Sequence, residues 1–148
     1  MVVAAYLYVY GFWLLLPLLC LAALGWGGWP ERIVAFLFLA AAAGSILLKS
    51  SVTGGYRTIE IGVLIVDLLL LAGLVWVMVQ ADRRWLIWVV ALQAISTTGH
   101  LAKLVTPDLS RMAYALMVGA SSYPALLLLC LGIVAHHRAR RRGAPDRF

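Results

Sequence analysis

Long apolar runs fill most of the chain, and short polar or basic stretches separate them. A helix needs about 20 apolar residues to cross the roughly 30 Å hydrocarbon core of a bilayer. Five runs reach or approach that length: residues 6–26, 32–49, 59–80, 85–103 and 110–135. The second run is the shortest and fits a complete span least well. The pattern predicts an all-α integral membrane protein, a bundle of about five transmembrane helices.

Composition supports this class and restricts the domain organisation. Of the 148 residues, 64% are hydrophobic and 12% are charged, which excludes an ordinary soluble protein. The connections between the apolar runs are too short to hold a soluble domain. We therefore expect one transmembrane domain, residues 1–137, followed by a basic tail, residues 138–148. Any chemistry must take place inside the membrane or at its edges.

The net charge of +6 is concentrated in the tail. The positive-inside rule places such a tail in the cytoplasm, and five spans then place the N-terminus outside. We expect a protein of a bacterial inner (plasma) membrane. A cluster of arginines beside a membrane suits anionic lipid headgroups; nucleic acid is the weaker partner, because no folded basic surface accompanies the tail. The arginines expected to bind lipid are Arg138, Arg140, Arg141 and Arg142.

One predicted helical hairpin, residues 58–104, carries the ionisable groups that lie deepest in the apolar runs. Glu60 and Asp67 are seven residues apart and therefore share one helix face, two turns apart. The return arm has a polar stripe formed by Gln93, Ser96, Thr97 and His100. An ionisable side chain in hydrocarbon is costly unless it is paired or hydrated, so these positions are the candidate functional residues.

The turn at residues 81–84 sets the relative height of these groups. Counting equally from the turn, the level of Asp67 is reached near Thr98 on the return arm. At a rise of about 1.5 Å per residue, that level is about 3 Å from His100. A contact from Asp67 to Thr97 or His100 is therefore feasible in height. The rotation of the two helices decides whether it forms, and the sequence does not fix that rotation.

Each candidate also has a structural explanation. Arg57 precedes Glu60 by three residues, so a surface ion pair accounts for Glu60. Asp67 makes a structural hydrogen bond to another helix, forms a proton or cation site, or lies in a water-filled crevice with no defined role. His100 is either a packing residue near the end of a span or a proton relay, because imidazole titrates near physiological pH. The sequence leaves these alternatives open.

Motifs for metal, cofactor or covalent chemistry are missing from the sequence. Cys20 and Cys130 both lie inside apolar runs, where a cysteine usually serves as a small apolar residue. No CxxC pair, Cys/His ligand spacing or nucleophile elbow occurs. We therefore predict neither metal nor cofactor. An enzyme acting on a lipid or quinone is the least favoured of the functional hypotheses.

Three functional hypotheses follow from the polar hairpin. The first, which we favour, is a small transporter or channel in which Asp67, with Thr97 and His100, forms a proton or cation site. A chain this short needs partners to enclose a pathway, so this hypothesis includes a homo-oligomer, with the small residues 40–44 as a contact. The second is an accessory or assembly subunit of a larger membrane complex. A water-reachable cavity at Asp67 favours the first; a dry, hydrogen-bonded Asp67 favours the second.

Overall fold

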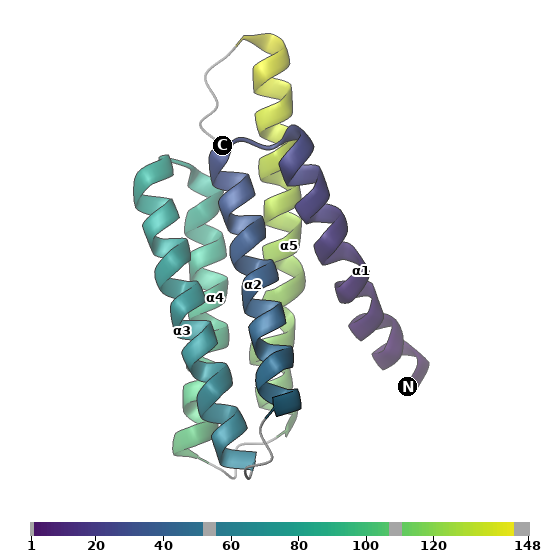
Figure 1. The fold of residues 1–148 in the computed structure, drawn as a ribbon, viewed down its shortest axis with the longest axis vertical. Coiled ribbons are helices and arrows are strands. Elements are labelled where there is room, and N and C mark those ends of the chain that lie inside the picture. The colour runs from purple at the N-terminus through teal and green to yellow at the C-terminus, as the bar shows by residue number, and fades with distance from the viewer. Residues whose placement is uncertain (1, 52–55, 107–110, 144–148) are drawn as a thin grey trace.

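The computed structural model consists of helices throughout the part of the chain that it describes (Figure 1). It describes the backbone of residues 2–51, 56–106 and 111–143, and the side chains of residues 10–48, 61–106 and 121–143. The helices are α1 (Val2–Trp26), α2 (Trp29–Ser51), α3 (Tyr56–Ala81), α4 (Arg84–Val105) and α5 (Arg111–Arg142). The predicted all-helical class is therefore confirmed.

Three of these helices are long and apolar enough to cross a membrane: Trp29–Leu48, Ile61–Ala81 and Arg84–Val105. The first of them corresponds to the run that fitted a complete span least well from sequence. It is longer than the apolar run because the helix already begins at Trp29. Pro30 then lies in the first turn, where proline is well tolerated. In α1, the residues with described side chains form a shorter apolar stretch, Tyr10–Trp26.

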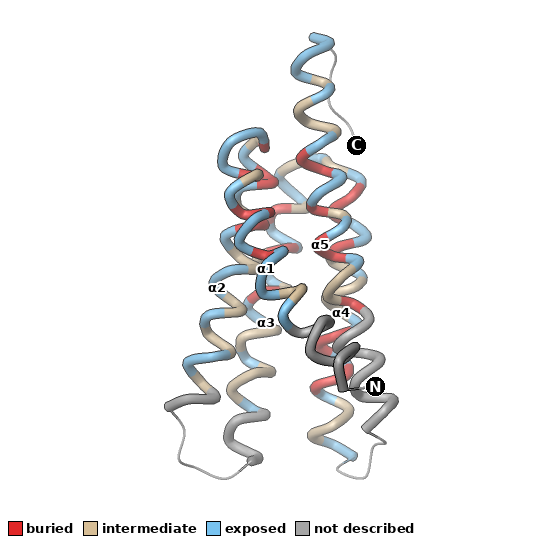
Figure 2. The backbone as a smooth tube through the Cα atoms, turned by 90° about the vertical axis from the view of Figure 1, so that its right-hand side faces the viewer, coloured by how far each residue is buried: buried red, intermediate tan, exposed pale blue. Residues whose placement is uncertain are grey.

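Helices α2, α3, α4 and α5 form an arc in which each helix packs against the next one in the chain (Figures 1 and 2). The two ends of the arc, α2 and α5, contact each other least of all the packed helix pairs. Helix α1 packs against both of them and so covers the seam between them. Towards its N-terminus, α1 leans away from the bundle (Figure 1).

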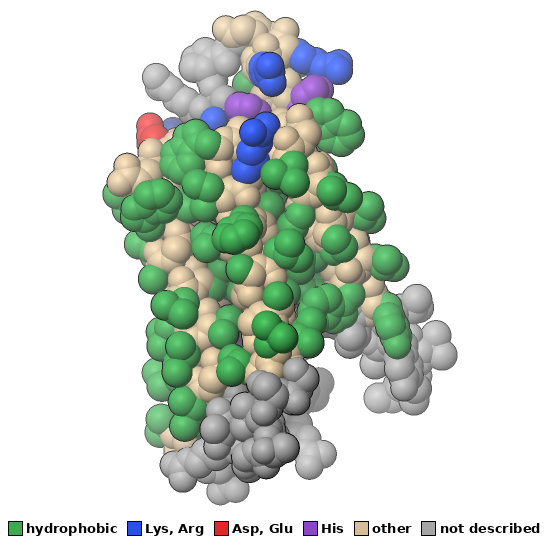
Figure 3. All heavy atoms as spheres, in the orientation of Figure 1, with side chains coloured by type: hydrophobic (Ala, Val, Ile, Leu, Met, Phe, Trp, Pro, Cys, Tyr) green, Lys and Arg blue, Asp and Glu red, His purple; other side chains and the backbone are tan. Residues whose placement is uncertain are grey.

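The α1–α2 turn, the α3–α4 turn and the arginine-rich end of α5 lie at the same end of the bundle, which we call the basic end. We call the opposite end the far end. Arginine and histidine side chains gather at the basic end in Figure 3. One turn joins α1 to α2, and there Gly28 N–H donates a hydrogen bond of 2.8 Å to Glu31 Oε2. The other turn joins α3 to α4, and Asp82 adopts a left-handed conformation with φ of 48°. Asp tolerates this region better than most residues because its short polar side chain can bond locally.

The apolar core occupies the half of the bundle nearest the basic end (Figure 2). Every helix contributes buried side chains from its part near this end. They include Leu16, Leu19, Ala23, Val34, Leu74, Val77, Trp85, Leu86, Val89, Leu129 and Ile133. Packing is close enough that a Cβ added to Gly132 would lie 2.8 Å from Trp85 Cε2, so α5 needs glycine where it meets this ring.

Small residues allow α2 and α3 to approach each other. A Cβ on Gly44 would lie 3.5 Å from Val66, and one on Gly73 would lie 3.1 Å from Leu37. The small-residue stretch 40–44 therefore takes part in packing within the chain, while Ala40 and Ala43 remain exposed. Both cysteines are free: Cys20 is buried and its Sγ–H donates to Ala35 O at 3.3 Å, whereas Cys130 is exposed.

Candidate functional site

A pocket of about 450 Å³ lies on the far side of the apolar core, between the helices of the arc and α1. Each of the five helices contributes to its wall. The lining residues are Phe12, Trp13, Phe38, Ala41, Ala42, Ser45, Val63, Asp67, Leu70, Gln93, Ser96, His100, Ser121, Ser122, Ala125 and Leu126. The pocket is therefore apolar towards α1 and α2 and polar towards α3, α4 and the start of the described part of α5.

Asp67 and His100 meet in this pocket. His100 Nε2 lies 3.2 Å from Asp67 Oδ2, and the two side chains are only 9% and 14% exposed respectively. This is an ion-pair distance when the imidazole is protonated. The geometry is not that of an aligned hydrogen bond, however, because Asp67 Oδ2 is buried without a hydrogen-bond partner. One carboxylate oxygen therefore remains able to accept a further donor.

Gln93 and Ser96 extend the polar side of the pocket along α4. Their spacing of three and then four residues to His100 places all three on one helix face. The Gln93 carboxamide lies beside the Asp67 carboxyl. It makes no aligned hydrogen bond there, since its Nε2 is also buried without a partner. Asp67 Oδ2 and Gln93 Nε2 thus make no aligned hydrogen bond within the protein, although Asp67 lies beside Gln93 and at ion-pair distance from His100, which is uncommon for buried polar groups.

Thr97 does not belong to this site, although the sequence placed it there. Its hydroxyl donates to the backbone oxygen of Gln93, one turn earlier, at 2.9 Å. Thr98 does the same with Ala94 at 2.7 Å. Hydroxyls in helices commonly make such bonds to the preceding turn, and a hydroxyl that does so is turned along its own helix. Thr97 is buried but does not line the pocket.

The remaining predicted residues are Glu60, Arg57 and the arginines of the tail. The side chains of Glu60 and Arg57 fall outside the described residues, so the expected ion pair between them is a prediction still. Four arginines were expected to form a lipid-binding tail: Arg138, Arg140, Arg141 and Arg142. They are exposed and lie on the last turns of α5, which continues beyond the other helices at the basic end (Figure 1).

Sequence reasoning did not identify the walls that α1, α2 and α5 contribute. Phe12 and Phe38 give no local signal, because an aromatic residue in an apolar run is ordinary in a membrane helix. Phe12 stacks edge-on against Tyr123 with ring centroids 6.1 Å apart, which holds α1 beside α5. Ser121 and Ser122 were detectable, since a Ser-Ser pair interrupts the fifth apolar run. Nothing in the sequence linked them to Asp67.

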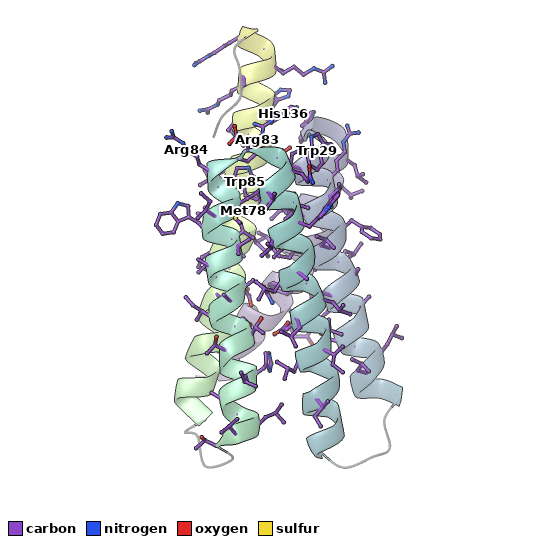
Figure 4. The ribbon with its side chains drawn as sticks, turned by 90° about the vertical axis from the view of Figure 1, so that its left-hand side faces the viewer. Trp29, Met78, Arg83, Arg84, Trp85 and His136 are labelled. Carbon is purple, nitrogen blue, oxygen red and sulfur yellow. The ribbon has the colours of Figure 1, made fainter. Side chains whose placement is uncertain are left out.

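A second buried carboxylate lies at the basic end. Glu31 is fully buried, and only one of its oxygens has a partner, the Gly28 N–H. His136 is close by, since its Cε1 and Glu31 Oε2 both lie 3.0 Å from where a Cβ of Gly28 would sit. Figure 4 places His136 at this end, near the labelled Trp29 and Arg83. Glu31 ties the turn to the start of α2, as a carboxylate in the first turn of a helix often does.

No group of three or more His, Cys, Asp or Glu side chains that could hold a metal ion occurs among the described residues. The chemistry available in the pocket is therefore that of one carboxylate, one imidazole, one carboxamide and several hydroxyls. Comparisons of the chain with protein-family models, with curated proteins and with solved structures found no match.

Proposed function

We propose that the chain is a small polytopic membrane protein that binds a proton or cation at Asp67 and takes part in proton- or cation-linked transport. The observation that carries the proposal is the state of Asp67. Its carboxylate faces a pocket of about 450 Å³, and its Oδ2 is buried without a hydrogen-bond partner. A carboxylate kept only for helix packing would be expected in a dry site with its oxygens satisfied.

His100 gives the site a way to exchange protons. Among the described residues that line the pocket, Asp67 on α3 and His100 on α4 are the ionisable ones, and the described lining residues of α1, α2 and α5 add no other. Protonated His100 compensates the charge of Asp67; once His100 loses its proton, the carboxylate is free to bind another cation. A proton and a cation therefore compete for one carboxylate, which is the basic requirement for coupling them.

The proposed arrangement in the membrane has five spans, with the basic end in the cytoplasm and the N-terminus outside. The exposed arginines at the end of α5 support this orientation. The membrane is proposed to be the plasma membrane, with anionic lipid headgroups beside the tail. In this orientation the pocket lies in the outer half and the apolar core separates it from the cytoplasm. A complete pathway then needs either a rearrangement or a second copy, and exposed Ala40 and Ala43 offer a contact.

Cation flux into proteoliposomes tests the proposal. Replacing Asp67 with Asn keeps the size of the side chain and removes its charge, so flux should fall to the level of empty liposomes. Asp82→Asn is the matched control, because Asp82 is exposed in the α3–α4 turn and should tolerate Asn in its left-handed conformation. His100→Gln should change the pH dependence of flux without abolishing it.

Two outcomes would contradict the transport proposal. One is unaltered flux in Asp67→Asn protein that elutes as wild type does in size-exclusion chromatography. The other is no flux of protons or any alkali cation through the wild-type protein. The accessory-subunit hypothesis would then take first place, and the mass of the native complex extracted with its lipids would identify the partner.

Labelling of single cysteines in a cysteine-free variant tests the orientation. A cysteine at position 54 should react with a membrane-impermeant maleimide added to intact cells, and a cysteine at position 142 should react only after lysis. The reverse pattern would invert the proposed topology.

A further inference from the structure

A bare inorganic cation would fill only a small part of the pocket around Asp67. Metal and alkali cations are held by several oxygen ligands at fixed short distances. This pocket offers one carboxylate together with carboxamide and hydroxyl oxygens, and its volume of about 450 Å³ is within the range of sites that hold small organic molecules. The size of the pocket therefore points to a ligand that is larger than a metal ion.

The walls divide the pocket into an apolar side and a charged side. Phe12 and Trp13 on α1 and Phe38 on α2 form an aromatic wall, and Leu70 and Leu126 close the end nearest the core. The charged side carries Asp67, together with the Gln93, Ser96 and His100 side chains of α4. A ligand that fits both sides has an apolar body and a polar, positively charged group.

We propose that this pocket binds a small organic ammonium ion that carries an apolar or aromatic substituent, in exchange for the proton shared by Asp67 and His100. The assignment rests on the proposed function and names its substrate class. Asp67 Oδ2, which has no hydrogen-bond partner, is the counter-ion for the ammonium group. Aromatic rings attract organic ammonium ions through their negative faces, and desolvation in a pocket strengthens that attraction.

Competition with His100 couples binding of the ammonium ion to release of a proton. His100 Nε2 already lies 3.2 Å from Asp67 Oδ2, so an ammonium group that reaches this oxygen meets the imidazolium at close range. Two cations beside one carboxylate repel each other, and the imidazolium relieves the repulsion by releasing its proton. Ammonium binding therefore strengthens as pH rises through the titration of the pair, by up to about tenfold per pH unit when one proton is displaced.

Part of the pocket wall, at α1, is exposed at the side of the bundle. Helix α1 covers the seam between α2 and α5, and Trp13, which lines the pocket, is 41% exposed. Ala41 and Ala42 on α2 continue the lining beside it. An amphiphilic cation that partitions into the lipid can thus meet this exposed part of the wall first with its apolar substituent.

Isothermal titration calorimetry on the purified protein in lipid nanodiscs tests this inference. The probe is 2-phenylethyl(trimethyl)ammonium, whose charge is permanent, so any proton released on mixing comes from the protein. The neutral probe 2-phenylethanol has the same ring and chain without the charge. We expect the ammonium probe to bind at least about tenfold more tightly, since its charge is attracted both by the Asp67 carboxylate and by the aromatic rings, whereas the alcohol carries no charge. We also expect its binding to release protons into weakly buffered solution.

Matched variants locate the binding. Asp67→Asn should weaken binding of the ammonium probe by roughly tenfold or more and abolish proton release, while Asp82→Asn should change neither. Phe38→Leu should weaken binding by about three- to tenfold, as expected for one ring beside a desolvated cation. Phe36→Leu is its control, because Phe36 lies on the same helix but is exposed.

The outcomes separate this inference from the proposed function. Equal affinity for the ammonium probe and the alcohol, or binding that Asp67→Asn does not weaken, overturns the ammonium assignment even where proton flux persists. Selective binding that depends on Asp67 and releases a proton supports the assignment even where no flux is measured. In that second case transport alone is contradicted, and the protein binds the cation without carrying it.

Discussion

The two halves of this bundle differ in how their interiors are filled. Near the basic end, large apolar side chains such as Leu16, Leu74 and Leu86 are fully buried and contact one another. On the far side of Leu70 and Leu126, the interior contains a pocket and most of the buried polar side chains that are described. The same five helices therefore build a packed half and a hollow half.

The difference separates close packing from the candidate site along the helix axes. The free energy that holds helices together in lipid comes mainly from close packing, because lipid tails are as apolar as leucine. The packed half supplies that contact. The hollow half leaves volume unfilled and polar atoms unsatisfied, which lowers stability and is retained where a site requires it. Substitutions in the packed half should therefore mainly lower stability, whereas substitutions in the hollow half should have little effect on stability and mainly affect the proposed site.

The largest expected effect on stability is in the packed half. Leu74→Ala removes a fully buried side chain and should lower the free energy of unfolding by about 2–4 kcal/mol through the cavity it leaves. Leu69→Ala, on the exposed face of the same helix, should cost much less. Reversible unfolding in mixed detergent and SDS micelles measures both. Equal losses in the two variants would show that the basic half is not the packed half.

A smaller effect is expected where α5 meets Trp85. Gly132→Ala places a methyl group 2.8 Å from the ring of a residue in the core, which should cost about 1–2 kcal/mol as the ring shifts. Gly25→Ala is the control, because nothing lies within 4 Å of the added Cβ and a helix favours alanine over glycine. The same unfolding titration distinguishes them. Unchanged stability in Gly132→Ala would mean that this contact is loose.

The smallest effect is expected in the hollow half. Ser96→Ala removes a hydroxyl that faces the pocket, and the free energy of unfolding should change by at most about 0.5 kcal/mol, because no packed contact is lost. Thermal unfolding in nanodiscs, followed by circular dichroism, provides the measurement. A loss as large as that of Leu74→Ala would make Ser96 part of the packing and would remove the contrast between the halves.

The helical class was predictable because apolar runs of membrane length are a strong local signal. The height of Asp67 and His100 was predictable for a similar reason: a short turn fixes the relative register of two helices in a hairpin. The structure brings these two side chains to 3.2 Å, the arrangement that the register permitted. Rotation about the helix axis was not predictable, since it depends on contacts with α2 and α5.

Thr97 shows why a polar stripe is an incomplete guide to a site. It occupies the helix face that the spacing indicated, yet its hydroxyl bonds to the backbone of its own helix. The aromatic wall shows the opposite case, in which residues that line the pocket were not recognised from the sequence. Phe12 comes from a helix distant in sequence from Asp67, and the packing of α1 across the seam brings it to the pocket that Asp67 and Phe38 also line. Such long-range arrangements leave no trace in local periodicity.

The position of α1 has a consequence for biosynthesis. The chain is made from its N-terminus, so α1 exists before any other helix, while one of the two helices it packs against, α5, is the last to be made. The α3–α4 hairpin that carries Asp67 and His100 can pair as soon as its own turn is complete. The pocket around it waits for residues near Tyr123 to arrive and meet Phe12. A nascent chain therefore acquires its ionisable pair early and the enclosure of that pair last.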